Sequence, residues 1–117
     1  MFDYYMKSQA EQFNFIRIPK ILITEELFDS LSIQAKLLYG MLIDRMGTSY
    51  KNQWIDEENR VYIIYSIKDI QQDMRVSKHK AIDNLAELER IGLVEKKLRG
   101  NGMPAHLYVK NFVSASA

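Results

Sequence analysis

The stretch 66–92 reads as two short helices joined by a tight turn, and it restricts the possible folds more than any other part of the chain. A serine, Ser66 or Ser77, stands where each helix is expected to begin, and a serine oxygen can accept a hydrogen bond from the first turn of a helix. Gly92 follows the second helix, where a missing Cβ tolerates the left-handed backbone of a C-cap. With residues 75–76 as the turn, the stretch predicts a helix-turn-helix.

Residues 93–109 continue as two extended runs around the tip Gly100-Asn101-Gly102, which predicts a β-hairpin. The run 61–65 is a further short strand that we expect to pair with this hairpin. A helix-turn-helix followed by a basic hairpin is the plan of a winged-helix DNA-binding domain. The predicted fold class is therefore α+β: a winged helix-turn-helix with a three-helix core, a small antiparallel sheet and a basic wing, preceded by an extended N-terminal arm.

The remaining helix of the core is expected between Ser32 and Gly47. Apolar residues at 35, 38, 42 and 46 follow helical spacing, Ser32 suits the N-cap, and Gly47 is expected to end the helix. Residues 48–59, rich in Asn, Asp, Glu and Ser, then form a loop. We predict that the winged-helix domain spans 24–112 and that 113–117 begin a linker.

Residues 1–23 are predicted to be an arm. Side chains along 13–23 alternate as in a strand, and Pro19, which has no N–H, places that strand at an edge or ends it. An exposed apolar strand needs a cover, so we expect the arm to make a self-association contact. The residues expected in that contact are Phe13, Phe15, Ile16 and Ile18.

The charge of the chain is segregated, although its net value is only +1. Residues 1–59 carry six Lys or Arg against nine Asp or Glu, whereas residues 60–110 carry ten against six. The basic excess coincides with the helix-turn-helix and the hairpin, where a nucleic-acid surface needs it. Chance segregation stays open as an alternative.

Two lysines, Lys78 and Lys80, stand in the first turn of the second helix, where the helix macrodipole is positive. Cations that the helix disfavours indicate an anionic partner, and this turn is the part of a recognition helix that reaches bases and phosphates in a major groove. An ordinary solvated face is the alternative, and protection of an edge strand is the alternative for the cations of the hairpin.

The inward side of this helix is expected to consist of Ala81, Ile82, Leu85, Leu88 and Ile91. Asn84 then falls on the outer or flanking faces, where an amide can pair with adenine. Lys96 and Lys97 alternate along the hairpin, so at most one of them shares the DNA-facing side. The predicted DNA contacts are Lys68, Arg75, Ser77, Lys78, His79, Lys80, Asn84, Lys97, Arg99 and Asn101.

No pattern of a catalytic or metal site is found in the sequence. The chain has no cysteine, so it has neither a disulfide framework nor a thiolate ligand, which fits a reducing cytoplasm. Its two histidines, His79 and His106, lack ligand-spaced partners, and the acidic run 56–58 is expected to be a solvated turn. No apolar run approaches the roughly 20 residues that span a bilayer, and the N-terminus lacks a secretory pattern. We expect no enzyme activity, no cofactor and no membrane contact.

Residues 31–45 follow the pattern LS-x-x-AK-x-LY-x-x-L-x-D-R, and residues 54–62 follow W-x-D-x-x-x-R-x-Y. Together with 15–20 and 88–108, these segments closely resemble the N-terminal domain of RepA-type (RepA_N family) plasmid replication initiators of Gram-positive bacteria. The resemblance covers roughly residues 13–110 and is more specific than a generic winged helix.

The resemblance implies a domain that binds repeated sites, called iterons, in a plasmid origin and starts plasmid replication. It implies a recognition helix at 77–91, a wing at 93–110, self-association through the arm as a dimer or higher oligomer, and a C-terminal domain, absent from this chain, that engages host replication proteins. Two other functions stay open: a winged-helix transcriptional regulator and a module that docks on a replisome protein.

Overall fold

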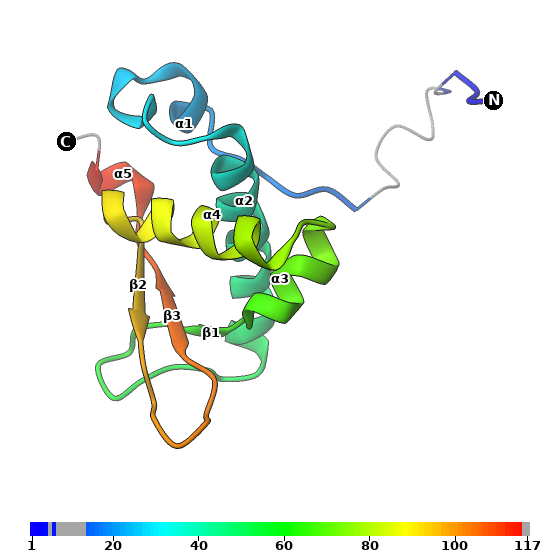
Figure 1. Cartoon of the computed structure of the whole chain (residues 1–117). Coiled ribbons are helices and arrows are strands. Elements are labelled where there is room, and N and C mark those ends of the chain that lie inside the picture. The colour runs from blue at the N-terminus through cyan, green and yellow to red at the C-terminus, as the bar shows by residue number, and fades with distance from the viewer. Residues whose placement is uncertain (5, 7–13, 116–117) are drawn as a thin grey trace.

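The computed structural model describes residues 1–4, 6 and 14–115, without the side chains of 48–50, 114 and 115. Its elements are α1 (Ile21–Thr24), the 3-10 turn η1 (Glu26–Phe28), α2 (Ile33–Lys51), β1 (Ile63–Ile64), α3 (Ile67–Met74), α4 (Lys78–Ile91), β2 (Val94–Lys97), β3 (His106–Val109) and α5 (Phe112–Ala115). Figure 1 shows α4 crossing α2, with α3 next to α4 and the β2–β3 hairpin projecting beyond the sheet. The fold is a winged helix-turn-helix, so the predicted fold class is confirmed.

The sheet has the strand order β1-β3-β2, and both pairs are antiparallel. Leu107 pairs with Ile63 on one side and with Lys96 on the other, whereas His106 pairs with Ile64 and with Lys97. Directly paired residues of an antiparallel sheet share a face. Buried Ile63 and Leu107 therefore mark the inner face, and His106 marks the outer face.

The hydrophobic core lies between α2, α3, α4 and the inner face of the sheet, and it also takes in the segment before α2. Its fully buried large side chains are Leu22, Phe28, Leu38, Tyr39, Leu42, Ile63, Ile70, Leu88, Leu93 and Leu107. Burial raises the pKa of Tyr39 to about 12, and the Tyr39 hydroxyl donates a 2.6 Å hydrogen bond to the carbonyl of Lys110. This bond ties α2 to the segment between β3 and α5.

The prediction that α2 ends at Gly47 is wrong, because the helix continues to Lys51. A single glycine inside a helix costs only about 1 kcal/mol relative to alanine, and one more turn of backbone hydrogen bonds can offset that. The expected loop therefore starts one turn later than predicted. A bridge between Ile55 and Val61 closes it, and β1 is limited to Ile63 and Ile64.

The arm also differs from its prediction. Residues 14–19 form no strand, and the following residues form the short helix α1, in which Leu22 is completely buried. The preceding segment runs along α2 at Gly40, where an added Cβ would lie 2.9 Å from Ile18 Cγ1 and 3.3 Å from the Arg17 carbonyl oxygen. The absence of a side chain at Gly40 permits this approach. Leu22, which precedes the predicted start of the domain at residue 24, is thus buried with the core.

Candidate nucleic-acid interface

Both helices of the helix-turn-helix are capped by the predicted serines. The Ser66 hydroxyl accepts a 3.0 Å hydrogen bond from the Asp69 N–H, and the Asp69 carboxylate accepts one from the Ser66 N–H, which completes a capping box. The Ser77 hydroxyl accepts a 3.1 Å hydrogen bond from the Lys80 N–H. Gly92 ends α4 with φ 90°, as expected for its C-cap. The ends of α3 and α4 therefore follow from local sequence.

The first turn of α4 is a cluster of exposed basic and imidazole side chains. Lys78, His79 and Lys80 are all exposed, and among the described residues no carboxylate lies within ion-pair distance of either lysine. Ser77 is exposed beside them, and Arg75 is exposed in the turn that precedes them. The structure therefore brings together the predicted contacts of the turn and the α4 N-terminus. Lys68 is exposed on α3.

The predicted faces of Asn84 and Ile82 are wrong. Asn84 lies on the inner side of α4, and Ile82 does not. Asn84 is 3% exposed, whereas Ile82 is 44% exposed. The buried positions Ala81, Asn84, Leu85 and Leu88 are spaced by three, one and three residues, so Asn84 belongs to the buried stripe and Ile82 lies beside it. The Asn84 side-chain amide donates a 3.0 Å hydrogen bond to Gln34 Oε1 on α2. Asn84 is thus placed to position α4, not to read bases.

A second polar contact joins the same two helices. The Glu87 carboxylate on α4 accepts hydrogen bonds from the N–H and the hydroxyl of Ser32, at 2.7 and 2.8 Å. The Ser32 hydroxyl also accepts a bond from the Ala35 N–H, so Ser32 is the N-cap of α2 and at the same time an anchor for α4. The orientation of α4 on α2 therefore depends on two polar contacts as well as on apolar packing.

Replacement of Asn84 by alanine should lower stability without changing which DNA sequence is preferred. The variant leaves the Gln34 amide oxygen without its partner and removes buried volume, which together cost about 1–3 kcal/mol. Urea unfolding and competition binding with two unrelated duplexes measure the two effects. A changed base preference with unchanged stability would contradict this position for Asn84.

The wing carries its charges on two different faces. Lys97 pairs with His106 on the outer face, and the Arg99 guanidinium contacts His106 Nε2. Lys96 lies on the inner face, opposite Leu107, and is a basic residue of the wing that is not among the predicted DNA contacts. The strand register, which the sequence alone does not give, is the signal that distinguishes these lysines. Asn101, at the tip, has a left-handed backbone with φ 52°.

His106 is stacked into an aromatic group at the base of the wing. Its ring lies 3.9 Å from that of Tyr62 at an angle of 9°, and the Tyr62 ring lies nearly parallel to that of Trp54. Burial, followed by the positive charges of Arg99 and Lys97, lowers the pKa of His106. A neutral imidazole can accept a hydrogen bond from Arg99. The loop 52–62 and the wing are therefore joined through these rings.

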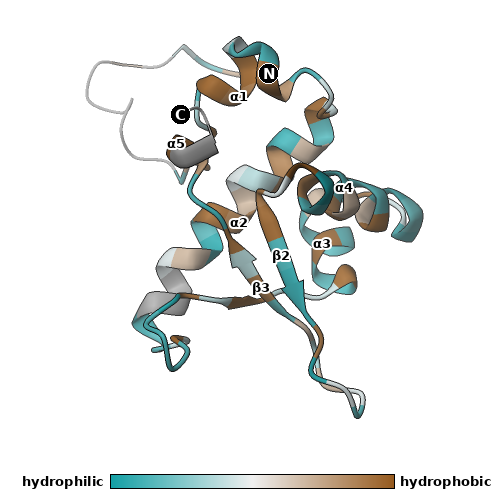
Figure 2. Ribbon diagram, turned by 90° about the vertical axis from the view of Figure 1, so that its left-hand side faces the viewer, coloured by the Kyte–Doolittle hydropathy of each residue, from teal (hydrophilic) through white to brown (hydrophobic). Residues whose placement is uncertain are grey.

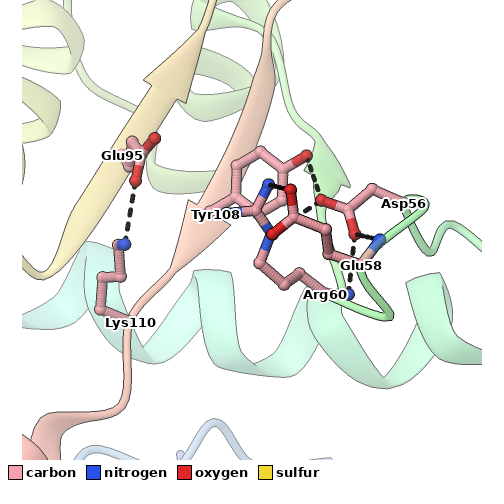
Figure 3. Close-up of polar contacts among 6 residues, drawn as sticks. All are labelled: Asp56, Glu58, Arg60, Glu95, Tyr108 and Lys110. Atoms are coloured by element: carbon pink, nitrogen blue, oxygen red, sulfur yellow. Dashed lines mark hydrogen bonds and ion pairs between the residues drawn. The ribbon is translucent and has the colours of Figure 1, made fainter.

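The acidic run 56–58 is more than a solvated turn, because Asp56 is a hydrogen-bonding centre (Figure 3). Its carboxylate accepts bonds from the Arg60 guanidinium and N–H, the Glu58 N–H and the Tyr108 hydroxyl. Partial burial opposes ionisation of Asp56, but these bonds prevail and lower its pKa to about 2. The Arg60 guanidinium also lies over the Tyr108 ring.

A separate 2.9 Å ion pair joins Glu95 on β2 to Lys110, the residue after β3 (Figure 3).

The residues predicted for self-association lie apart from this basic surface. Phe15 is 62% exposed and Ile16 is 38% exposed, whereas Ile18 is half-buried against α2. Phe13 lies outside the described residues. Self-association through the arm stays a prediction.

Within the described ranges, no cluster of three or more His, Asp or Glu side chains is arranged to hold a metal ion. In the same part of the chain, no helix combines the length and apolar character that crossing a bilayer requires.

Comparisons by family model, sequence and structure each find proteins similar to this chain. The family model described as "Replication initiator protein A (RepA) N-terminus" matches residues 14–117. A curated "41 kDa protein" of Lactobacillus helveticus is 29% identical over 91 residues, which are 78% of this chain and 26% of that protein. The chain thus spans about a quarter of the length of this relative.

Similar solved structures include "N-Terminal domain of DNA binding protein" and "Structure of Rep-DNA complex", each 31% identical with a TM-score of 0.79. The matches cover 95% and 93% of this chain and 85% and 84% of the other chains, respectively. A third, "Structure of MDR initiator", is 28% identical with a TM-score of 0.75 and covers 93% of this chain and 86% of its own.

Proposed function

This chain belongs to the RepA_N family, the N-terminal domains of replication initiator protein A, and on that basis we propose that it binds double-stranded DNA during plasmid replication. The observation that carries the proposal is the exposed group of Lys78, His79 and Lys80 at the N-terminus of α4. A similar solved structure is described as a Rep-DNA complex, which supports the same partner for this chain.

The geometry favours a two-part contact with a duplex. An α-helix fits the major groove of B-DNA, and the lysines in the first turn of α4 form no ion pair with a carboxylate of the described residues. In Figure 2, α3, α4 and the tip of the wing lie on the same side of α2, so one duplex can meet all three. We assign the first turn of α4 to the major groove and the wing to the flanking backbone or minor groove.

We further propose that the bound sites are repeats in the plasmid origin and that several copies of the chain assemble on them. The exposed apolar side chains of Phe15 and Ile16 support an assembly contact. The chain spans about a quarter of its curated relative, and host replication proteins are proposed partners of the remaining part of such initiators. We also propose that the chain acts by binding DNA and not as an enzyme. We propose the cytoplasm as its location.

Footprinting on the plasmid's own origin, compared with a promoter fragment of the replication gene, tests this function. We expect protection at regularly spaced repeats of the origin at protein concentrations that leave the promoter fragment free. Equal protection of a single promoter site, with no repeated pattern in the origin, would identify a transcriptional regulator instead. No protection of either fragment would favour a module that docks on another protein.

A further inference from the structure

The tip of the wing exposes two large apolar side chains. Leu98 is 76% exposed and Met103 is 52% exposed, although both lie in the most basic part of the chain. They flank the turn in which the Met103 N–H donates a 2.9 Å hydrogen bond to the Gly100 carbonyl. This turn has left-handed backbone from Gly100 to Gly102. A tight turn thus closes the tip at residues 100–103, and the two apolar side chains lie in the tip between β2 and β3.

The strand register ends at the pair Lys97–His106, and alternation continued beyond that pair assigns both side chains to the inner side of the hairpin. Along β2, Val94 and Lys96 face inward, and alternation continues this face to Leu98. Along β3, Leu107 faces inward, and the same alternation leads back to Met103. The contact of Arg99 with His106 on the outer face agrees with this assignment. Leu98 and Met103 therefore extend the face that carries the core, beyond the point where the helices cover it.

The surroundings of this apolar tip identify its partner. After Glu95 the sequence contains no further Asp or Glu, and Lys96, Lys97 and Arg99 lie next to Leu98. A surface of this charge attracts a polyanion. A stable protein interface buries about 800 Å² on each partner and is depleted of charge at its centre, whereas Leu98 is surrounded by cations. Leucine and methionine are, in contrast, among the side chains that enter between base pairs from the minor groove.

We propose that Leu98, with Met103 beside it, is an apolar wedge that enters a base step of the minor groove next to the site contacted by α4. The wedge unstacks that step and bends the duplex towards its major groove, while the adjacent cations hold the phosphates on either side. This inference rests on the proposed DNA binding. It adds that the wing deforms the duplex, so that binding prefers a sequence that is easily unstacked at a position that α4 does not touch.

The test uses the full chain and a series of repeat duplexes, each with 2-aminopurine at a different position. The fluorescence of this adenine analogue rises when it is unstacked. At saturating protein, we expect a several-fold rise at one step beside the α4 site, and a bend of about 20–90° by energy transfer between the duplex ends. Leu98→Ala should abolish the rise and reduce the bend, and Leu98→Phe should retain both.

Ile33→Ala is the matched control, because Ile33 is an aliphatic residue on α2 with 66% exposure, far along the chain from the wing. This variant should leave both signals unchanged, and the control and both Leu98 variants should unfold at the same temperature as the wild type.

A saturated duplex without unstacking at any position would overturn the wedge and leave DNA binding intact. Unstacking that survives Leu98→Ala would also overturn it, as would a Leu98→Ala chain that bends DNA normally but no longer associates with a second copy. A wild-type chain that binds no duplex would overturn the proposed function, and the wedge with it.

Discussion

Replacing Lys78 and Lys80 together by alanine should weaken binding to a repeat duplex about 50-fold at about 0.1 M salt. Each lysine that neutralises a phosphate releases counterions, and the slope of log K against log salt changes by about 0.9 for each phosphate that is no longer neutralised. We therefore expect the magnitude of the slope to fall by about 2. Fluorescence polarisation titrations at several salt concentrations between about 0.05 and 0.3 M measure both quantities.

The control for charge alone is the double variant Lys20→Ala with Arg90→Ala. It also removes two positive charges, but at exposed positions away from the first turn of α4: one directly before α1 and one near the C-terminal end of α4. Affinity should fall only slightly in this protein. If both double variants weaken binding equally, the net charge of the chain and not the first turn of α4 determines affinity. If neither variant weakens it, the recognition surface lies elsewhere.

Replacing Leu22 by alanine should lower the free energy of unfolding by about 3 kcal/mol. Leu22 is completely buried in the core, and truncation of a buried leucine side chain costs about 2–5 kcal/mol through reduced burial and the cavity left behind. For a domain of this size, the melting temperature should fall by about 10 °C. Thermal and urea unfolding measure this effect.

The adjacent residue provides the comparison. Ile23 is 55% exposed, so Ile23→Ala should change the free energy of unfolding by less than about 1 kcal/mol. Equal and small effects of both substitutions would mean that residues before 24 belong to an arm, as the sequence suggested. A large effect of Leu22→Ala alone would show that α1 is part of the folding unit.

The sequence predicted those features that depend on neighbouring residues. Ser66, Ser77 and Gly92 were recognised as helix ends because a cap needs only a few residues of the same segment. The hairpin and its tip were recognised for the same reason, since glycine and asparagine tolerate left-handed backbone. Because Ser77 marks the N-cap of α4, the sequence also placed Lys78 and Lys80 in the first turn of that helix.

Features that depend on contacts between distant segments were missed. Apolar spacing along α4 favours Ile82 over the polar Asn84 for the inner side, and only the partner of Asn84 on α2 reveals its burial. Leu22 lies in a helix of four residues, which is too short to show a period. The face of Lys96 depends on the register between β2 and β3, and no local pattern gives that register. The residues that contact DNA stay predictions, identified by face and exposure.

Arg75 has a left-handed backbone with φ 55° at the turn between α3 and α4. For residues other than glycine this conformation costs about 1–2 kcal/mol, and glycine avoids most of that cost. The chain nevertheless carries a permanent positive charge there, two residues before the cap of α4. If Arg75 contacts DNA as predicted, glycine at position 75 would give the more stable domain and arginine the more tightly DNA-binding one.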